Sequence, residues 1–202
     1  MKPYPSCRYT HGAIDAALQI VAENRLAPGD IARVTVRIPP RDFYTVGGGG
    51  DKARDEALRC PASVVDAQFS VFYTVATAIV KGKVVLEYLS ENGLADPEIL
   101  AMAKRVSTVV DETLVVTDRD VQPQAVEIET ANGKRYAKQV DYPKGSPQWP
   151  MTPEERRNKF WDCMDHAAVP IDRKRTQQAL DLIENLESLD KVSRLTRVLS
   201  SQ

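Results

Sequence analysis

The spacing of apolar residues predicts a helix and then a strand at the start of the chain. Between His11 and Asn24 apolar side chains recur every three or four positions, as on one face of an α-helix. A turn is predicted at Pro28, Gly29 and Asp30. From Ile31 to Ile38 apolar and polar residues alternate, which is typical of a half-buried strand in an antiparallel sheet.

The middle of the chain combines an irregular stretch with several helices. Residues 41–62 include four consecutive glycines, and we expect a long loop here, functional or disordered. A buried helix is predicted from Ser63 to Gly82, because its middle is apolar almost all round. Shorter helices are predicted from Val84 to Glu91 and from Asp96 to Arg105, the second with Asp96 as N-cap.

The second half predicts strands and then helices, which gives an α+β fold class. Asn132 and Gly133 indicate a hairpin between the last two of four strand-like runs. These runs are Val106–Val110, Thr113–Thr117, Ala125–Thr130 and Arg135–Val140. A linker from Tyr142 to Pro153 precedes helices that extend to about His166, from Asp172 to about Ser188, and from Leu189 to Leu199. We therefore expect a small antiparallel sheet packed with helices in residues 1–145, and a C-terminal helical segment in residues 146–202.

Composition narrows the class of protein. The formal net charge is −1, so no global basic field attracts nucleic acid. The three cysteines Cys7, Cys60 and Cys163 lack the spacing of a disulfide framework or a zinc site, which favours a cytoplasmic protein. No apolar run approaches the ~20 residues that span a bilayer. The first residues also lack the apolar core of a signal peptide.

Three blocks of the chain, taken in order, resemble the MmgE/PrpD family. The first runs from Lys2 to Cys7 (KPYPSC) and continues from His11 to Ala16 (HGAIDA). The second runs from Asp66 to Ser70 (DAQFS), followed by Tyr73, Ala76 and Gly82. The third comprises Lys144 to Pro147 (KGSP), Pro150 to Glu155 (PMTPEE), Lys159 and Phe160. The order and spacing of the blocks are similar to the C-terminal part of family members, over essentially the whole chain.

The resemblance implies a fold and a reaction. The family includes 2-methylcitrate dehydratase, cis-aconitate decarboxylase and iminodisuccinate epimerase, lyase-type enzymes for small di- and tricarboxylates that need no metal or organic cofactor. In the family a large helical domain comes first and carries the proposed acid/base Asp and His, and the C-terminal helices return to that domain. Here Met1 directly precedes the first block. We therefore expect one wall of a cleft, inactive without the helical domain.

The resemblance places Lys2, His11 and Tyr44 as candidate catalytic residues. The ammonium of Lys2 can hold a substrate carboxylate as a point charge, although a solvated terminal lysine is an equal alternative. His11 opens a helix, where an imidazole faces an anion or else packs as a structural residue. Tyr44 reaches the substrate in the family, against the alternative of a loop aromatic that covers the core.

The candidate substrate-binding residues are Lys2, Cys7, Gln68 and Ser70. Cys7 is near the site by resemblance, but the reaction needs no covalent thiolate, so a small buried residue is the competing interpretation. Gln68 and Ser70 lie on or near one face of the predicted buried helix. Gln68 is expected to contact the substrate or the helical domain.

Three functional hypotheses remain open. The chain is the C-terminal part of a lyase that acts with a separate helical-domain polypeptide, or it is a non-catalytic domain that folds and forms a homodimer or other homo-oligomer. The amphipathic C-terminal helices, with Leu180, Ile183, Leu186 and Leu189, support an exposed apolar surface that such assembly would cover. The third hypothesis is a small-anion binding module. Neither nucleic acid nor a membrane is expected as a partner.

Overall fold

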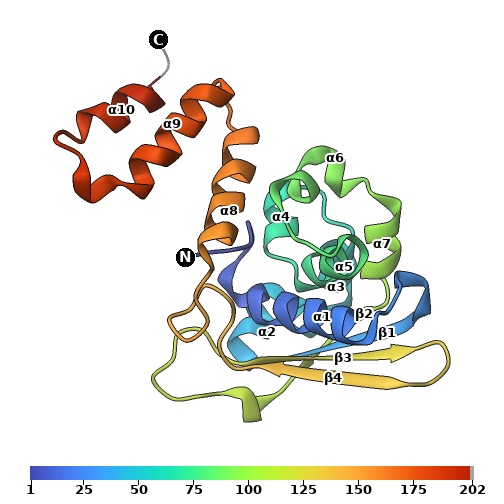
Figure 1. Ribbon diagram of the computed structural model, residues 1–202. Helices are drawn as coiled ribbons and strands as arrows, with labels where there is room; N and C mark the ends of the chain where they lie inside the picture. Colours follow the sequence, from blue (N-terminus) through green and yellow to red (C-terminus); the bar gives the residue numbers. More distant parts are fainter. Residues whose placement is uncertain (201–202) are drawn as a thin grey trace. The chain divides into compact units, whose positions relative to one another are not determined.

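The computed structural model describes residues 1–200 and divides the chain into two compact units, Met1–Pro150 and Met151–Gln202 (Figure 1). The first unit is an α+β domain, as predicted. Its helices are η1 (Arg8–Thr10), α1 (His11–Asn24), η2 (Pro28–Asp30), α2 (Pro40–Val46), η3 (Gly48–Gly50), α3 (Lys52–Arg59), α4 (Val64–Gln68), α5 (Val71–Lys81), η4 (Leu86–Leu89), α6 (Glu91–Leu94), α7 (Pro97–Ala103) and η5 (Glu112–Leu114). Its strands are β1 (Ile31–Ile38), β2 (Val106–Val110), β3 (Gln124–Thr130) and β4 (Arg135–Val140).

The four strands form a mixed sheet in the order β2-β1-β3-β4. β3 is antiparallel to both β1 and β4, and Gly133, with a φ of 81°, lies in the predicted hairpin turn. β2 runs parallel to β1, so the prediction of an antiparallel sheet is wrong for this strand. The chain between these two strands forms a long helical crossover, which permits the parallel pairing.

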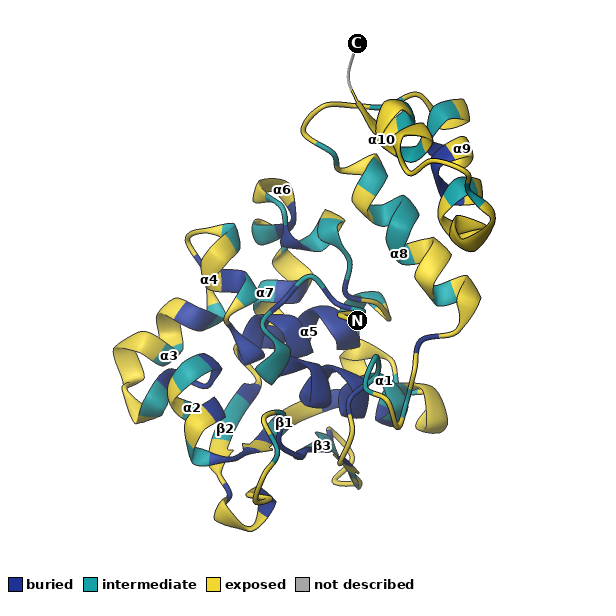
Figure 2. Cartoon of the chain, turned by 90° about the vertical axis from the view of Figure 1, so that its left-hand side faces the viewer, coloured by how far each residue is buried: buried dark blue, intermediate teal, exposed yellow. Residues whose placement is uncertain are grey.

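One face of the sheet is covered by helices. α1 packs against β3 and β4, and α5 packs against α1 on the other side (Figure 1). The buried residues gather in these two helices and on the facing side of the sheet (Figure 2). In β1 the predicted alternation holds, because Val34, Val36 and Ile38 are fully buried whereas Arg33 and Arg37 are exposed.

Residues 41–62 are largely helical, so the predicted long loop is wrong. Pro40 begins α2, where its fixed φ suits the first helical position. Asp51 caps α3 by accepting hydrogen bonds from the backbone of Ala53 and Arg54. Gly48, Gly49 and Gly50 all have positive φ and make the tight turn between the two helices.

Three other predicted elements also differ. The helix expected from Ser63 to Gly82 is two helices, because Ser70 is extended and its hydroxyl caps α5 at Tyr73 N. The helix expected from Val84 to Glu91 is the short turn η4, with α6 after it. The strand expected from Thr113 to Thr117 is absent from the described residues, because Asp111 caps the turn η5 at that place.

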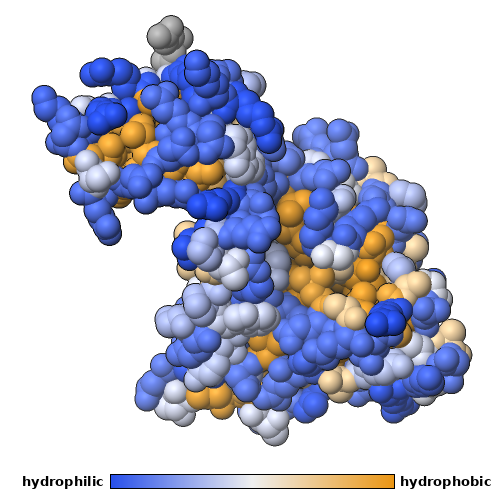
Figure 3. All heavy atoms as spheres, in the orientation of Figure 1, coloured by the Kyte–Doolittle hydropathy of each residue, from blue (hydrophilic) through white to orange (hydrophobic). Residues whose placement is uncertain are grey.

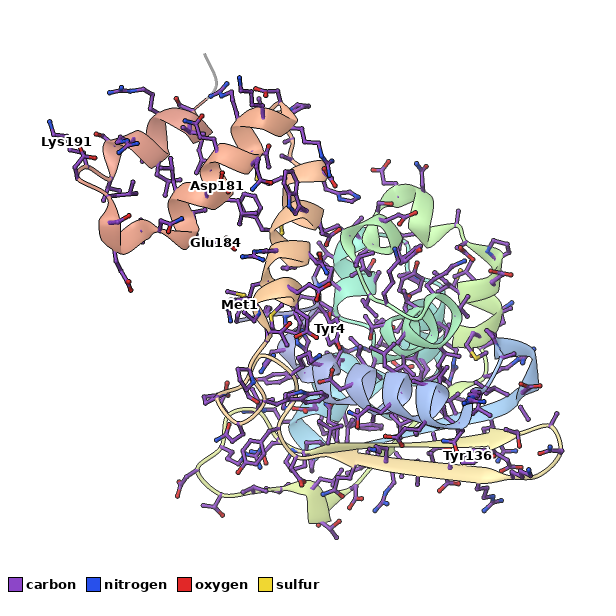
Figure 4. All side chains as sticks on the ribbon, in the orientation of Figure 1. Met1, Tyr4, Tyr136, Asp181, Glu184 and Lys191 are labelled. Carbon is purple, nitrogen blue, oxygen red and sulfur yellow. The ribbon has the colours of Figure 1, made fainter. Side chains whose placement is uncertain are left out.

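The second unit contains α8 (Pro153–Asp165), α9 (Arg173–Glu184), η6 (Leu186–Ser188) and α10 (Ser193–Leu199). Thr152 and Glu155 form the capping box expected at the start of α8. Arg157 on α8 pairs with Glu184 on α9, which is labelled in Figure 4. Leu180 is buried, but Ile183 and Leu186 are 40% and 49% exposed. Part of the apolar face of α9 therefore stays uncovered, and Figure 3 shows apolar surface near α9 and α10.

Tyr73 links α5 to η4 and α6, and its hydroxyl gives a test of the packing. The buried hydroxyl lies 2.7 Å from Gly93 O and 2.9 Å from Tyr88 O. We predict that Tyr73→Phe lowers the free energy of unfolding by about 1–3 kcal/mol, because it leaves buried carbonyl groups without their donor. Denaturant unfolding measures the loss. The same change at Tyr136, on the outer hairpin, is the control, and an equal loss there would contradict the assignment.

Candidate functional site

A small pocket brings together three of the sequence-predicted site residues. It has a volume of about 210 Å³ and is lined by Lys2, Pro5, Ser6, Cys7, Gln68 and Phe69. The first four belong to the N-terminal segment, and the last two lie at the end of α4. Cys7 N donates to Gln68 O at 2.8 Å, so a backbone hydrogen bond joins the two walls.

Lys2 and Cys7 give the pocket its chemical character. Lys2 is exposed, and its ammonium donates to Ser6 O at 3.2 Å, which leaves it further donors to offer a ligand. Burial raises the pKa of the Cys7 thiol, against the opposing effects of a backbone hydrogen bond from Tyr9 and the charge of Lys2. Cys7 is therefore a neutral thiol at pH 7, and the pocket offers one fixed positive charge.

Side-chain hydrogen bonds fix the shape of the N-terminal segment. Thr10 Oγ1 donates to Cys7 O at 2.9 Å and is also 2.9 Å from Ser6 Oγ. Tyr4 lies beside the start of α1 (Figure 4), and its ring makes an edge contact with His11 at 5.1 Å. The segment from Lys2 to Thr10 is thus an ordered loop with defined contacts.

The other predicted site residues lie outside this pocket. His11 is fully buried, with Nδ1 3.1 Å from Arg8 Nη1 and Nε2 3.4 Å from Ser6 O, contacts that fit a structural histidine. Ser70 is also fully buried, and its hydroxyl donates to Leu58 O and caps α5. Tyr44 is on α2 and is 64% exposed. Its neighbour Thr45 lines a larger cavity of about 440 Å³, which shares Phe69 with the small pocket.

A buried carboxylate that the sequence analysis missed anchors the segment. Asp15 on α1 accepts hydrogen bonds from Tyr4 Oη at 2.5 Å and from Lys144 N at 2.7 Å. Arg8 Nη1 donates to Lys144 O at 2.9 Å. Burial raises the pKa of Asp15, while these hydrogen bonds favour the carboxylate. The available signal was one acidic residue among the apolar residues of the first helix.

A second buried carboxylate, Asp42 on α2, lies behind the segment. It is completely buried, and Gln124 Nε2 donates to its Oδ2 at 2.9 Å. Burial raises the pKa of Asp42 to about 6, against the opposing effects of the Gln124 hydrogen bond and of Arg41. Nothing in the local sequence pattern indicates this pair, because the two residues are 82 positions apart.

Neither a metal-binding cluster nor a membrane-spanning helix is found among the described residues. Within residues 1–200 no three side chains of His, Cys, Asp or Glu come together in a group that could hold a metal ion. In the same range no helix is long and apolar enough to cross a membrane.

Fold and pocket together define an α+β domain with a small pocket that Lys2 helps to line. The family model of the MmgE/PrpD C-terminal domain matches residues 4–186, so the chain belongs to this family. The resemblance to the C-terminal part of this family is thereby confirmed over the matched residues. A comparison with curated proteins gives no match.

The raised pKa of Asp42 predicts an unusual dependence of stability on pH. Its pKa is higher in the folded protein than in the unfolded chain, where it is near 3.9. The folded state therefore binds more of this proton between about pH 4 and 6, and Asp42 costs stability as the pH rises through that window. We predict that the free energy of unfolding of Asp42→Asn, relative to that of the wild type, rises by about 2 kcal/mol as the pH increases from 4.5 to 7.5.

Urea unfolding of both proteins across this range measures the difference in free energy of unfolding. Asp118→Asn removes an acidic charge from an exposed position and is the control. A difference between Asp42→Asn and the wild type that does not change with pH would contradict the assigned pKa.

Proposed function

We propose that the first unit supplies the cationic wall of a site for a small di- or tricarboxylate, such as 2-methylcitrate, in a cofactor-independent lyase-type reaction. Membership of the MmgE/PrpD family supports the reaction class, a dehydration, decarboxylation or epimerisation. The single observation that carries the proposal is the pocket between Lys2 and Gln68, which combines an available ammonium with an amide donor.

The ammonium of Lys2 binds one substrate carboxylate and orients the carbon chain. Gln68 offers its amide group to a second oxygen, and Cys7, kept neutral by burial, contributes a compact weakly polar surface. A proton abstracted next to a carboxylate leaves negative charge on that carboxylate, so a fixed cation lowers the energy of the transition state. This role needs neither a metal nor a covalent intermediate.

The residues that line the pocket do not include a general base and a general acid for neutral pH. The six lining residues contain neither a carboxylate nor an imidazole. A lyase reaction needs a base for the proton on carbon and an acid for the leaving group. We propose that a helical segment of the family type supplies both groups, either in a separate polypeptide or in another part of the protein. We also propose that the protein acts in the cytoplasm as a homodimer.

The same composition supports a second candidate function. A site with a cation and amide donors but no acid/base pair binds small carboxylates without turning them over. The chain on its own is then a non-catalytic anion-binding domain. Turnover after mixing with a helical-domain polypeptide of the family, assayed on a panel of citrate-like acids, distinguishes the two candidates.

Binding at the pocket can be tested with Cys7 as reporter. In a variant with Cys60→Ser and Cys163→Ser, Cys7 is the remaining thiol. We predict that fumarate slows alkylation of Cys7 by iodoacetamide, because a bound dicarboxylate covers the thiol. Lys2→Met should weaken the apparent affinity for fumarate by about 5-fold, the effect of one partly exposed charge pair.

Lys134→Met, in the exposed turn of the β3–β4 hairpin, is the matched control and should leave the affinity unchanged. Succinamide, which has the same length without charge, should give no protection. Equal alkylation rates with and without fumarate would reject the pocket as a carboxylate site.

A further inference from the structure

The N-terminus of α1 is capped by a residue from another element. Thr10 occupies the N-cap position but makes no capping bond, because its hydroxyl binds within the preceding loop. The backbone N–H of Ala13, one of the free donors of the first turn, instead donates to Gln124 Oε1 at 2.8 Å. Gln124 is the first residue of β3 and is 1% exposed.

The amide of Gln124 uses both of its ends. Nε2 donates to Tyr9 O, directly before the helix, and to Asp42 Oδ2. Gly12 lies against this side chain, and a Cβ at position 12 would come within 3.0 Å of Gln124 Oε1. The amide is therefore held tightly against the start of α1. The chain directly before α1 leads back to Cys7 and the pocket.

The charge of Asp42 reinforces the orientation of the amide that Ala13 N–H and Tyr9 O also favour. An ionised carboxylate can only accept hydrogen bonds, so it requires the NH₂ end of Gln124 and leaves the oxygen for Ala13. In the reversed orientation the amide oxygen would face a carboxylate, and the NH₂ group would face the N–H of Ala13. A neutral Asp42 removes its own contribution, because a protonated carboxyl group can either accept from NH₂ or donate to the amide oxygen. The amide is then held by Ala13 and Tyr9 alone.

Gln124 and Arg41 are the groups bonded or paired with Asp42. Arg41 on α2 has its Nε 3.6 Å from Oδ1. Asp120, in the loop before β3, contributes negative charge, and Arg41 also pairs with it. Cys7 and Tyr9 face it from the N-terminal segment. Of these groups Asp42 is the buried acid with a pKa of about 6, so its charge changes between pH 5 and 8.

We propose that Asp42 and Gln124 are positioning residues for the pocket: the buried carboxylate orients the amide, and the amide holds the Cys7–His11 segment in the geometry that binds a carboxylate. The part of this proposal that concerns ligand affinity rests on the proposed function. The part that concerns the coupling of Asp42 to the start of α1 does not.

The coupling is tested by following the backbone amide of Ala13 by NMR between pH 5 and 8. In the wild type its chemical shift should titrate with a midpoint near 6. In Asp42→Asn, which keeps an acceptor for Gln124 but carries no charge, this titration should disappear, and in Asp118→Asn it should remain. Gln124→Met should also abolish it, and this variant replaces Asp42→Asn in the test if the latter does not fold.

His11 begins the same helix, and histidines commonly titrate in this range. Asp15, whose pKa burial raises, also lies on this helix. A titration of Ala13 that survives in Asp42→Asn or in Gln124→Met would assign the shift to another group on α1 and overturn the proposal. An Ala13 shift that stays constant in the wild type would overturn it as well.

Ligand affinity gives the second measurement. Fumarate stays almost entirely ionised above pH 5.5, so its own charge does not change in the experiment. Calorimetry should show wild-type affinity falling at least 3-fold from pH 7.5 to 5.5, about 0.7 kcal/mol, and Asp42→Asn should show a flat profile. Parallel profiles for the two proteins would refute the positioning role. Absence of fumarate binding at every pH would reject the proposed function instead and would leave the NMR result to decide the coupling.

Discussion

The hydrogen bonds to the Asp15 carboxylate join the N-terminal segment, the loop after β4 and α1. Tyr4 and Lys144 lie far apart in the sequence, and both donate to this one side chain on α1. A carboxylate taken out of water is costly unless donors replace its hydration, so the two contacts must form together with the burial of α1. The N-terminal segment and the loop after β4 are thereby fixed to the same helix, and the pocket wall from Lys2 to Cys7 inherits that position.

The residues of the N-terminal segment fall into two groups. Lys2 and Cys7 face the pocket, whereas Tyr4 and His11 face the interior and hold the segment in place. The resemblance to the family marks all of this segment as important, but only the structure shows which of its residues line the pocket and which are buried. His11 is the clearest example, since its helix-start position suited an anion contact, yet its ring is enclosed.

The parts of the fold that depend on residues close together in the sequence could be predicted. Periodicity located α1, β1 and β2, and Asn132 with Gly133 located the hairpin. It failed where capping decided the outcome, as at Ser70, which breaks an apolar run, and at Asp51, which starts a helix after glycines. Of the residues that line the pocket, Lys2, Cys7 and Gln68 had been singled out through the family blocks. Asp42 and Gln124 were not, because their pairing is created only when distant segments meet.

The crossover between β1 and β2 has a consequence for the order of folding. α4, which carries the Gln68 wall of the pocket, lies inside this crossover, whereas the hairpin of β3 and β4 joins residues close in sequence. Closing a long loop costs more chain entropy than closing a short one, and pairings between distant segments form slowly. We therefore expect the hairpin to form early and the α4 wall of the pocket to be completed late. In a newly made chain the pocket would take shape only after the crossover between β1 and β2 has closed.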